Sequence, residues 1–140
     1  MRKIGLDYGD ARVGVAITDE LNITVQGLET IHHYGNDKLV LKRLDEIMEQ
    51  YNIDTIVIGM PINMDGSKSF RVEKTNQFIH KLKCKYNKIK VETIDERLTT
   101  VQAHKTMNDL GVKSKNKKNI VDTISAVYIL QIYVEKNTAI

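Results

Sequence analysis

Apolar residues alternate with polar or small ones over the first thirty positions, and this period of two predicts β-strands. The first strand surrounds Ile4 and Leu6, the second covers residues 13–17, and a third extends over 23–31 with a break near Gly27. Only short turns containing Gly, Asp or Asn separate these segments. Because short connections join antiparallel neighbours, we expect a three-stranded meander.

After Gly35 the apolar period lengthens to that of a helix, and helices then alternate with apolar strand segments. Asn36 or Asp37 is expected to cap the first helix. This order predicts an α/β fold with a five-stranded mixed sheet flanked by helices, which is the layout of the ribonuclease H-like fold. The predicted later elements are helices over about 37–51, 69–86, 99–110 and 119–133, and strands over about 54–59 and 89–95.

The composition is that of one soluble domain covering residues 1–140. Hydrophobic residues make up 41% and charged residues 28%, as is ordinary for a globular protein. No apolar run approaches the ~20 residues of a membrane span, so no membrane partner is expected. The single cysteine, Cys84, excludes an internal disulfide and a multi-cysteine zinc site, and it favours a cytoplasmic location.

Lysines gather in two short stretches, although the net charge of +3 by itself says little about partners. Five lysines lie within residues 81–90 and four within residues 113–118. Such clusters suit a nucleic-acid backbone, whereas solvated surface segments are the more common outcome for lysine runs alone.

Acidic residues stand at the ends of predicted elements. Asp7 ends the first strand, Asp95 and Glu96 end the fifth strand, and Asp122 lies in the expected first turn of the final helix. Sites in open α/β sheets lie outside the carboxyl ends of the strands, where three carboxylates would repel one another unless cations neutralised them. Oxygen ligands favour Mg²⁺ or Mn²⁺, and two such ions could clamp a phosphodiester. Each acid taken singly also has an ordinary structural explanation. Asp7 could form a turn, Asp95 or Glu96 could pair with a nearby cation, and Asp122 could interact with the helix dipole.

Alternation along the fifth strand allows only one of Asp95 and Glu96 to share a face with a given neighbour. The longer reach of Glu96 slightly favours it, and both stay candidates. Basic and hydroxyl side chains near the same edge are candidates for nucleic-acid contacts, since arginine suits phosphate and threonine at a helix N-terminus can donate to it. These candidates are Arg12, Arg97, Thr99, Thr100 and Lys118, the last expected just before the final helix.

Four motifs in this order resemble the YqgF family of bacterial proteins, also called RuvX, over nearly the whole chain. The motifs are Asp7-x-Gly9-x-x-Arg12-x-Gly14, then Gly59-x-Pro61 with Asp65-Gly66-Ser67, then Asp95-Glu96-Arg97-Leu98-Thr99-Thr100, and then Val121-Asp122 with Ser125-Ala126 and Ile129-Leu130-Gln131.

The resemblance implies a ribonuclease H-like fold, Mg²⁺-dependent nuclease activity and a cytoplasmic location. It also implies a role in maturing the 5′ end of the small-subunit (16S) ribosomal RNA precursor, or in cutting branched DNA such as Holliday junctions. Carried over by position, Asp7, Glu96 (or Asp95) and Asp122 would bind the metal. Ser125 stands where the family usually has alanine.

Resolvases of the RuvC type carry a glutamate at the end of the fourth strand. This chain has Gly59-Met60-Pro61 there, so the missing acid weakens the case for carrying junction resolution over from those relatives.

Four functions compete. The first is a metal-dependent phosphodiesterase acting on structured RNA, and the second is the same catalyst on four-way DNA junctions, which would need a homodimer to cut two strands. The third is an ATP-binding module, because the Asp-x-Gly turn also resembles the phosphate loop of sugar kinases, but those folds need two such subdomains. The fourth is a non-catalytic RNA-binding factor of ribosome assembly. We rank them in this order, with the second close behind the first.

Overall fold

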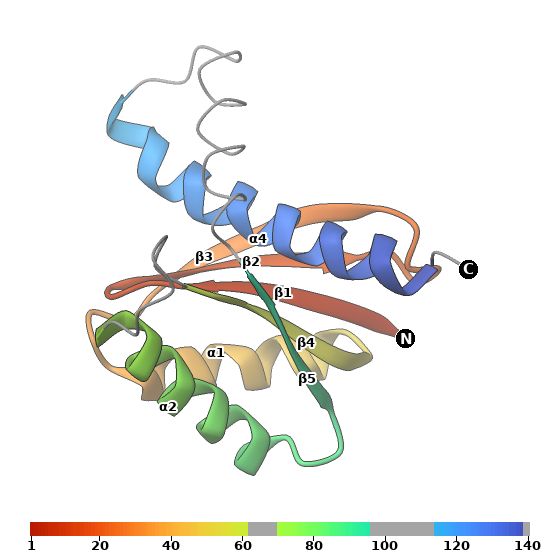
Figure 1. Cartoon of the computed structure of the whole chain (residues 1–140), viewed down its shortest axis with the longest axis horizontal. Helices are drawn as coiled ribbons and strands as arrows, with labels where there is room; N and C mark the ends of the chain where they lie inside the picture. The colour runs from red at the N-terminus through yellow and green to blue at the C-terminus, as the bar shows by residue number, and fades with distance from the viewer. Residues whose placement is uncertain (62–69, 96–113, 139–140) are drawn as a thin grey trace.

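The computed structural model describes residues 1–61, 70–95 and 114–138, with side chains of the last segment described for residues 123–136. Five strands form one sheet between helices on its two faces (Figure 1). The elements are β1 (Arg2–Tyr8), β2 (Arg12–Thr18), β3 (Val25–His32), α1 (Asp37–Gln50), β4 (Ile53–Met60), α2 (Phe70–Lys85), β5 (Lys90–Asp95) and α4 (Ser114–Thr138).

The sheet has the strand order β3-β2-β1-β4-β5. β1 pairs antiparallel with β2, and β2 with β3, which confirms the predicted meander. β1 pairs parallel with β4, and β4 with β5, so the sheet is mixed, as predicted. The break expected near Gly27 is a register shift in the β2–β3 pairing, where Val15 faces Glu29 but Ala16 faces Gly27.

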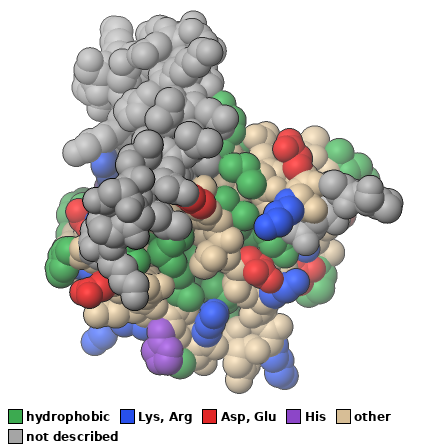
Figure 2. Space-filling view, in the orientation of Figure 1, with side chains coloured by type: hydrophobic (Ala, Val, Ile, Leu, Met, Phe, Trp, Pro, Cys, Tyr) green, Lys and Arg blue, Asp and Glu red, His purple; other side chains and the backbone are tan. Residues whose placement is uncertain are grey.

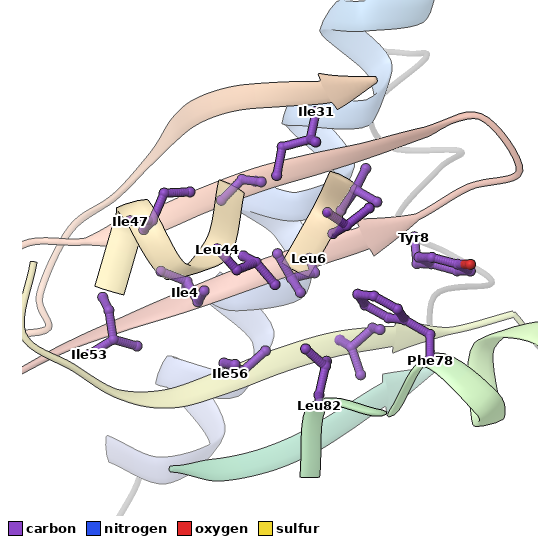
Figure 3. Close-up of a cluster of buried hydrophobic side chains, with 14 of the residues drawn as sticks. Ile4, Leu6, Tyr8, Ile31, Leu44, Ile47, Ile53, Ile56, Phe78 and Leu82 are labelled. Atoms are coloured by element: carbon purple, nitrogen blue, oxygen red, sulfur yellow. The ribbon is translucent and has the colours of Figure 1, made fainter. Parts of the chain in front are cut away.

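Helices α1 and α2 cover one face of the sheet. Asn36 caps α1 by accepting a hydrogen bond from the Lys38 N–H, as predicted for this position. Apolar residues spaced three and four apart on both helices meet the alternate apolar residues of the strands (Figure 3). At the carboxyl end of β1, the Tyr8 and Phe78 rings stack with their centroids 4.4 Å apart.

Helix α4 covers the opposite face (Figure 1). Ala126, Ile129 and Leu130 are fully buried there against Ala16 and Val57 of the sheet. Close approach depends on small residues: a Cβ on Gly5 of β1 would lie 2.8 Å from both the Ala126 carbonyl oxygen and the Leu130 Cβ. Such contacts are tighter than van der Waals packing allows, so α4 can lie this close to β1 only over a glycine.

The start of α4 corrects one expectation. The helix begins at Ser114 rather than near residue 119, so Lys118 lies inside α4 and Asp122 lies about two turns from its N-terminus instead of in the first turn. The lysine-rich stretch before residue 119 is helical because lysine is a good helix former and the stretch continues directly into the packed part of α4. The helix predicted over residues 99–110 lies outside the described residues.

Candidate active site at the carboxyl edge of the sheet

Asp7 lies near the carboxyl end of β1 on the α4 face, between two glycines. Gly5 faces α4, and Asp7 shares its side because strand residues alternate. Across the antiparallel pairing Asp7 faces Gly14. The parallel register with β4, extended by one residue, puts Gly59 on its other side. The partly buried Asp7 therefore has a residue without a side chain beside it on each neighbouring strand.

The N-terminal half of α4 extends toward this same edge. Thr123 of α4 and Thr30 at the end of β3 hold their Oγ1 atoms 3.1 Å apart. At the opposite end of the sheet, Val134 of α4 and Val25 at the start of β3 line one hollow. β3 and β1 are both antiparallel to β2, so the part of α4 around Thr123 lies toward the carboxyl ends of β1 and β3. Asp122, directly before Thr123, therefore lies on the part of α4 nearest that edge.

Strand β5 ends at the edge as well, where Met60 of β4 pairs with Asp95. Val91 packs against the core on the α1 and α2 face, whereas Ile94 packs against the α4 core. Alternation then assigns Asp95 to the α1 and α2 face, away from Asp7. Glu96, like Arg97, Thr99 and Thr100, lies outside the described residues.

A buried histidine, which the sequence analysis missed, holds the turn after Asp7. His33 is 1% exposed, and its Nδ1 accepts a hydrogen bond from the Gly35 N–H at 3.0 Å. Its Nε2 therefore carries the proton and donates to the Gly9 carbonyl oxygen at 2.8 Å. No sequence pattern distinguishes this histidine from its exposed neighbour His32, because the contact joins two segments that are distant in the chain.

Tyr8, next to Asp7, points the other way and is tied to the helices. Its hydroxyl donates to the Asp37 carboxylate at 2.6 Å, and Lys81 of α2 pairs with the same carboxylate at 3.0 Å. Burial and this hydrogen bond raise the pKa of Tyr8 far above its usual value. The end of β1 is thus fixed on both sides, by His33 at the turn and by the Tyr8–Asp37–Lys81 chain below the sheet.

Among the other candidates, Arg12 begins β2 and faces His32 of β3 across the antiparallel pairing. Arg12 alternates with Gly14 and so belongs to the same face as Asp7. Lys118 lies on α4, in the part whose side chains are not described. On the face seen in Figure 2, the described lysines and arginines lie interspersed with acidic side chains.

The chemistry of the edge suits a hard divalent cation. Asp7 offers carboxylate oxygens, and the flanking Gly14 and Gly59 place no side chain beside it. Among the described residues, no group of three or more His, Cys, Asp and Glu side chains could hold a metal ion. Within the same residues, no helix is long and apolar enough to cross a membrane.

Comparison with known sequences gives consistent results. The model of the RuvX family, described as Holliday junction resolvase, matches residues 1–136. A Ruminiclostridium cellulolyticum protein named pre-16S rRNA nuclease is 52% identical over 138 residues, covering 97% of this chain and 95% of its own. An Acetivibrio thermocellus protein of the same name is 48% identical over 135 residues, covering 96% of each chain.

Solved structures share the fold at low identity. Thermus thermophilus RuvC, in complex with a Holliday junction substrate, has a TM-score of 0.58 at 12% identity, covering 99% of this chain and 96% of that one. The fowlpox virus resolvase with Holliday junction DNA also has a TM-score of 0.58, at 13% identity, covering 99% and 100% of the two chains. These similarities confirm the predicted ribonuclease H-like fold.

Proposed function

The chain belongs to the RuvX family, and we propose that it is a nuclease that hydrolyses phosphodiester bonds at the carboxyl edge of its sheet. The observation that carries the proposal is the row Gly14–Asp7–Gly59, which continues on β3 to Thr30, the residue that meets Thr123 of α4. An acid on a central strand, bordered by residues without side chains, contributes little to packing but suits a site for a bound phosphate and cation.

Asp7, Glu96 and Asp122 would hold one or two Mg²⁺ or Mn²⁺ ions, which when bound supply an activated water and neutralise charge on the phosphate. Arg12, on the Asp7 face, would donate to a phosphate oxygen with its planar guanidinium. Arg97, Thr99, Thr100 and Lys118 would contact the backbone of the nucleic acid on either side. The alternation of β5 supports Glu96 over Asp95 as the third ligand.

The substrate we propose is structured precursor RNA, cleaved during 5′-end maturation of 16S rRNA in the cytoplasm. Two relatives with 52% and 48% identity carry that activity in their names. The second candidate is a four-way DNA junction, which the description of the family favours. A junction resolvase would act as a homodimer, so sedimentation of the chain with and without junction DNA separates the two.

The main experiment compares nicking of precursor 16S RNA and of a four-way DNA junction with Mg²⁺ or Mn²⁺. Asp7→Asn keeps the size of the side chain and removes a charge, so it should abolish cleavage while the melting temperature stays near that of the wild type. Asp10→Asn is the matched control, because Asp10 is exposed in the adjoining turn and its loss should leave cleavage intact. Cleavage by Asp7→Asn at the wild-type rate would refute the proposal.

A second comparison tests which acid after β5 takes part. Glu96→Gln should remove most of the activity, whereas Asp95→Asn should retain it, since alternation assigns Asp95 to the other face. The reverse result would mean that the strand changes its alternation at its end, and Asp95 would then replace Glu96 in the proposed ligand set.

A further inference from the structure

An exposed pair of aromatic rings stands beside the candidate active site. Tyr34 is 80% exposed, and its ring stacks on that of His32 with centroids 6.1 Å apart and an angle of 26° between the planes. Tyr34 also has φ of +52°, a left-handed conformation that is unfavourable for a bulky residue. Neither exposure nor this backbone conformation helps folding, so packing does not explain a tyrosine at this position.

The loop that carries Tyr34 is held firmly against the turn after Asp7. The backbone N–H groups of His33 and Tyr34 both donate to the Ala11 carbonyl oxygen, at 2.9 and 3.2 Å. The buried His33 ring adds its bond to the Gly9 carbonyl oxygen, and the Asn36 N–H donates to the His33 carbonyl oxygen at 2.8 Å. The ring of Tyr34 is therefore presented from a fixed backbone, which lowers the entropy lost when a ligand binds.

The position of the pair relative to Asp7 follows from the sheet. Thr30 contacts α4, so His32, two residues later on β3, belongs to the Asp7 face. His32 is on the second strand from Asp7 across the sheet and lies two residues further along that strand. At ordinary strand spacings their Cα atoms are then on the order of 12 Å apart. Arg12 is its direct partner on β2. A cation beside exposed aromatic rings is the combination with which proteins bind single-stranded nucleic acid.

We propose that His32 and Tyr34 form a stacking platform for an unpaired nucleobase of the substrate strand, a short distance along that strand from the bond that is cut at Asp7. This inference rests on the proposed function, because it takes the phosphate at Asp7 to belong to the same strand. A base in a duplex has its faces occupied by its neighbours, so the platform would favour single-stranded or unpaired segments near the cleavage site.

The test measures binding without cleavage, in the Asp7→Asn background. The probe is a twelve-nucleotide single-stranded RNA with 2-aminopurine placed at successive positions, and the same sequence as a blunt duplex is the comparison. Tyr34→Asn removes the ring, and asparagine tolerates the left-handed backbone, so the fold should survive. We expect a loss of roughly 5- to 150-fold in affinity for the single strand, with loss of 2-aminopurine quenching at one position.

Two control variants make the result specific. Tyr34→Phe keeps the ring and should bind as the parent does. Leu21→Asn replaces a 76% exposed side chain in the turn at the opposite end of the sheet and should change nothing. Unchanged affinity in Tyr34→Asn, equal losses in Tyr34→Phe and Tyr34→Asn, or no binding by the parent would each overturn the platform. If the parent binds and quenches but the wild type cuts nothing, the nuclease proposal fails while the platform stands.

Discussion

The contact between Gly27 and Thr123 offers a sharp test of how α4 is held on the sheet. A Cβ built on Gly27 would overlap the Thr123 Cγ2 methyl, whereas the next nearest atoms, Thr123 Cβ at 3.6 Å and a Val127 Cγ2 at 4.0 Å, are at ordinary contact distances. One methyl group therefore blocks any side chain at position 27. Thr123→Ser removes that methyl and keeps the Oγ1 that meets Thr30 at 3.1 Å.

The expected magnitudes follow from these contacts. Gly27→Ala forces one of two responses. Either α4 shifts, and such overpacking destabilises a core by about 1–3 kcal/mol, or Thr123 rotates and gives up a hydrogen bond worth about 0.5–1.5 kcal/mol. Thr123→Ser alone should cost about 0.8 kcal/mol for the lost methyl group. With the overlap gone, the double variant should be no less stable than Gly27→Ala, so the two changes should couple by about 1–2 kcal/mol.

Urea unfolding followed by circular dichroism measures all four members of this cycle. Each kcal/mol corresponds to roughly 3–5 °C in melting temperature for a chain of this size. Because Thr123 adjoins Asp122, nicking activity should fall in Gly27→Ala and recover in the double variant. Additive losses of stability, with no coupling, would mean that α4 does not rest on β3 as described.

Three further outcomes are expected. Ser125→Ala should raise the unfolding free energy measured in urea by about 1 kcal/mol, because the Ser125 hydroxyl is buried without a hydrogen-bond partner among the described residues. Gly5→Ala should lower it by about 1–3 kcal/mol, and no side-chain change can relieve the clash, since one atom met at 2.8 Å is the Ala126 backbone oxygen. Burial and the hydrogen bond to Asp37 raise the pKa of Tyr8 in the folded protein. The stabilisation from Tyr8 is therefore complete below the pKa of an unfolded tyrosine, about 10, and is lost as pH rises above it. Tyr8→Phe should reduce the fall in the urea midpoint between pH 9 and pH 11.

Elements with a clear period could be predicted from the sequence because the property that defines them is local. The alternation around Ile4 and Leu6 sets which side of β1 enters the core, and Asn36 marks the start of α1 with its own side chain. The start of α4 could not be found in this way. Residues 114–118 are polar and lack an apolar period, and they are helical in continuity with the packed segment around Ala126.

The candidate site was predictable only as a set of acids at the ends of predicted strands and at the start of a predicted helix. That Asp7 lies between Gly14 and Gly59 depends on the pairing register of three strands, and a shift of one residue would change every neighbour. The role of His33 depends on a contact with the Gly9 carbonyl oxygen across the meander. The sequence contains these residues, but their proximity comes from tertiary structure.

On the α4 face of the sheet, two neighbouring rows of residues, one through Gly5 and one through Asp7 of β1, differ in their side chains. The row through Gly5 supports α4, with Ala16 and Val57 on the neighbouring strands packed against it, whereas the row through Asp7 has glycine on both sides. These rows are about 7 Å apart, and the same helix contacts both, the second through Thr123 and Thr30. A change that lifts α4 from the first row must move it relative to the second, so stability and catalysis should be coupled here more tightly than on the α1 and α2 face. Substitutions under α4 should then reduce activity more than their effect on melting temperature alone explains.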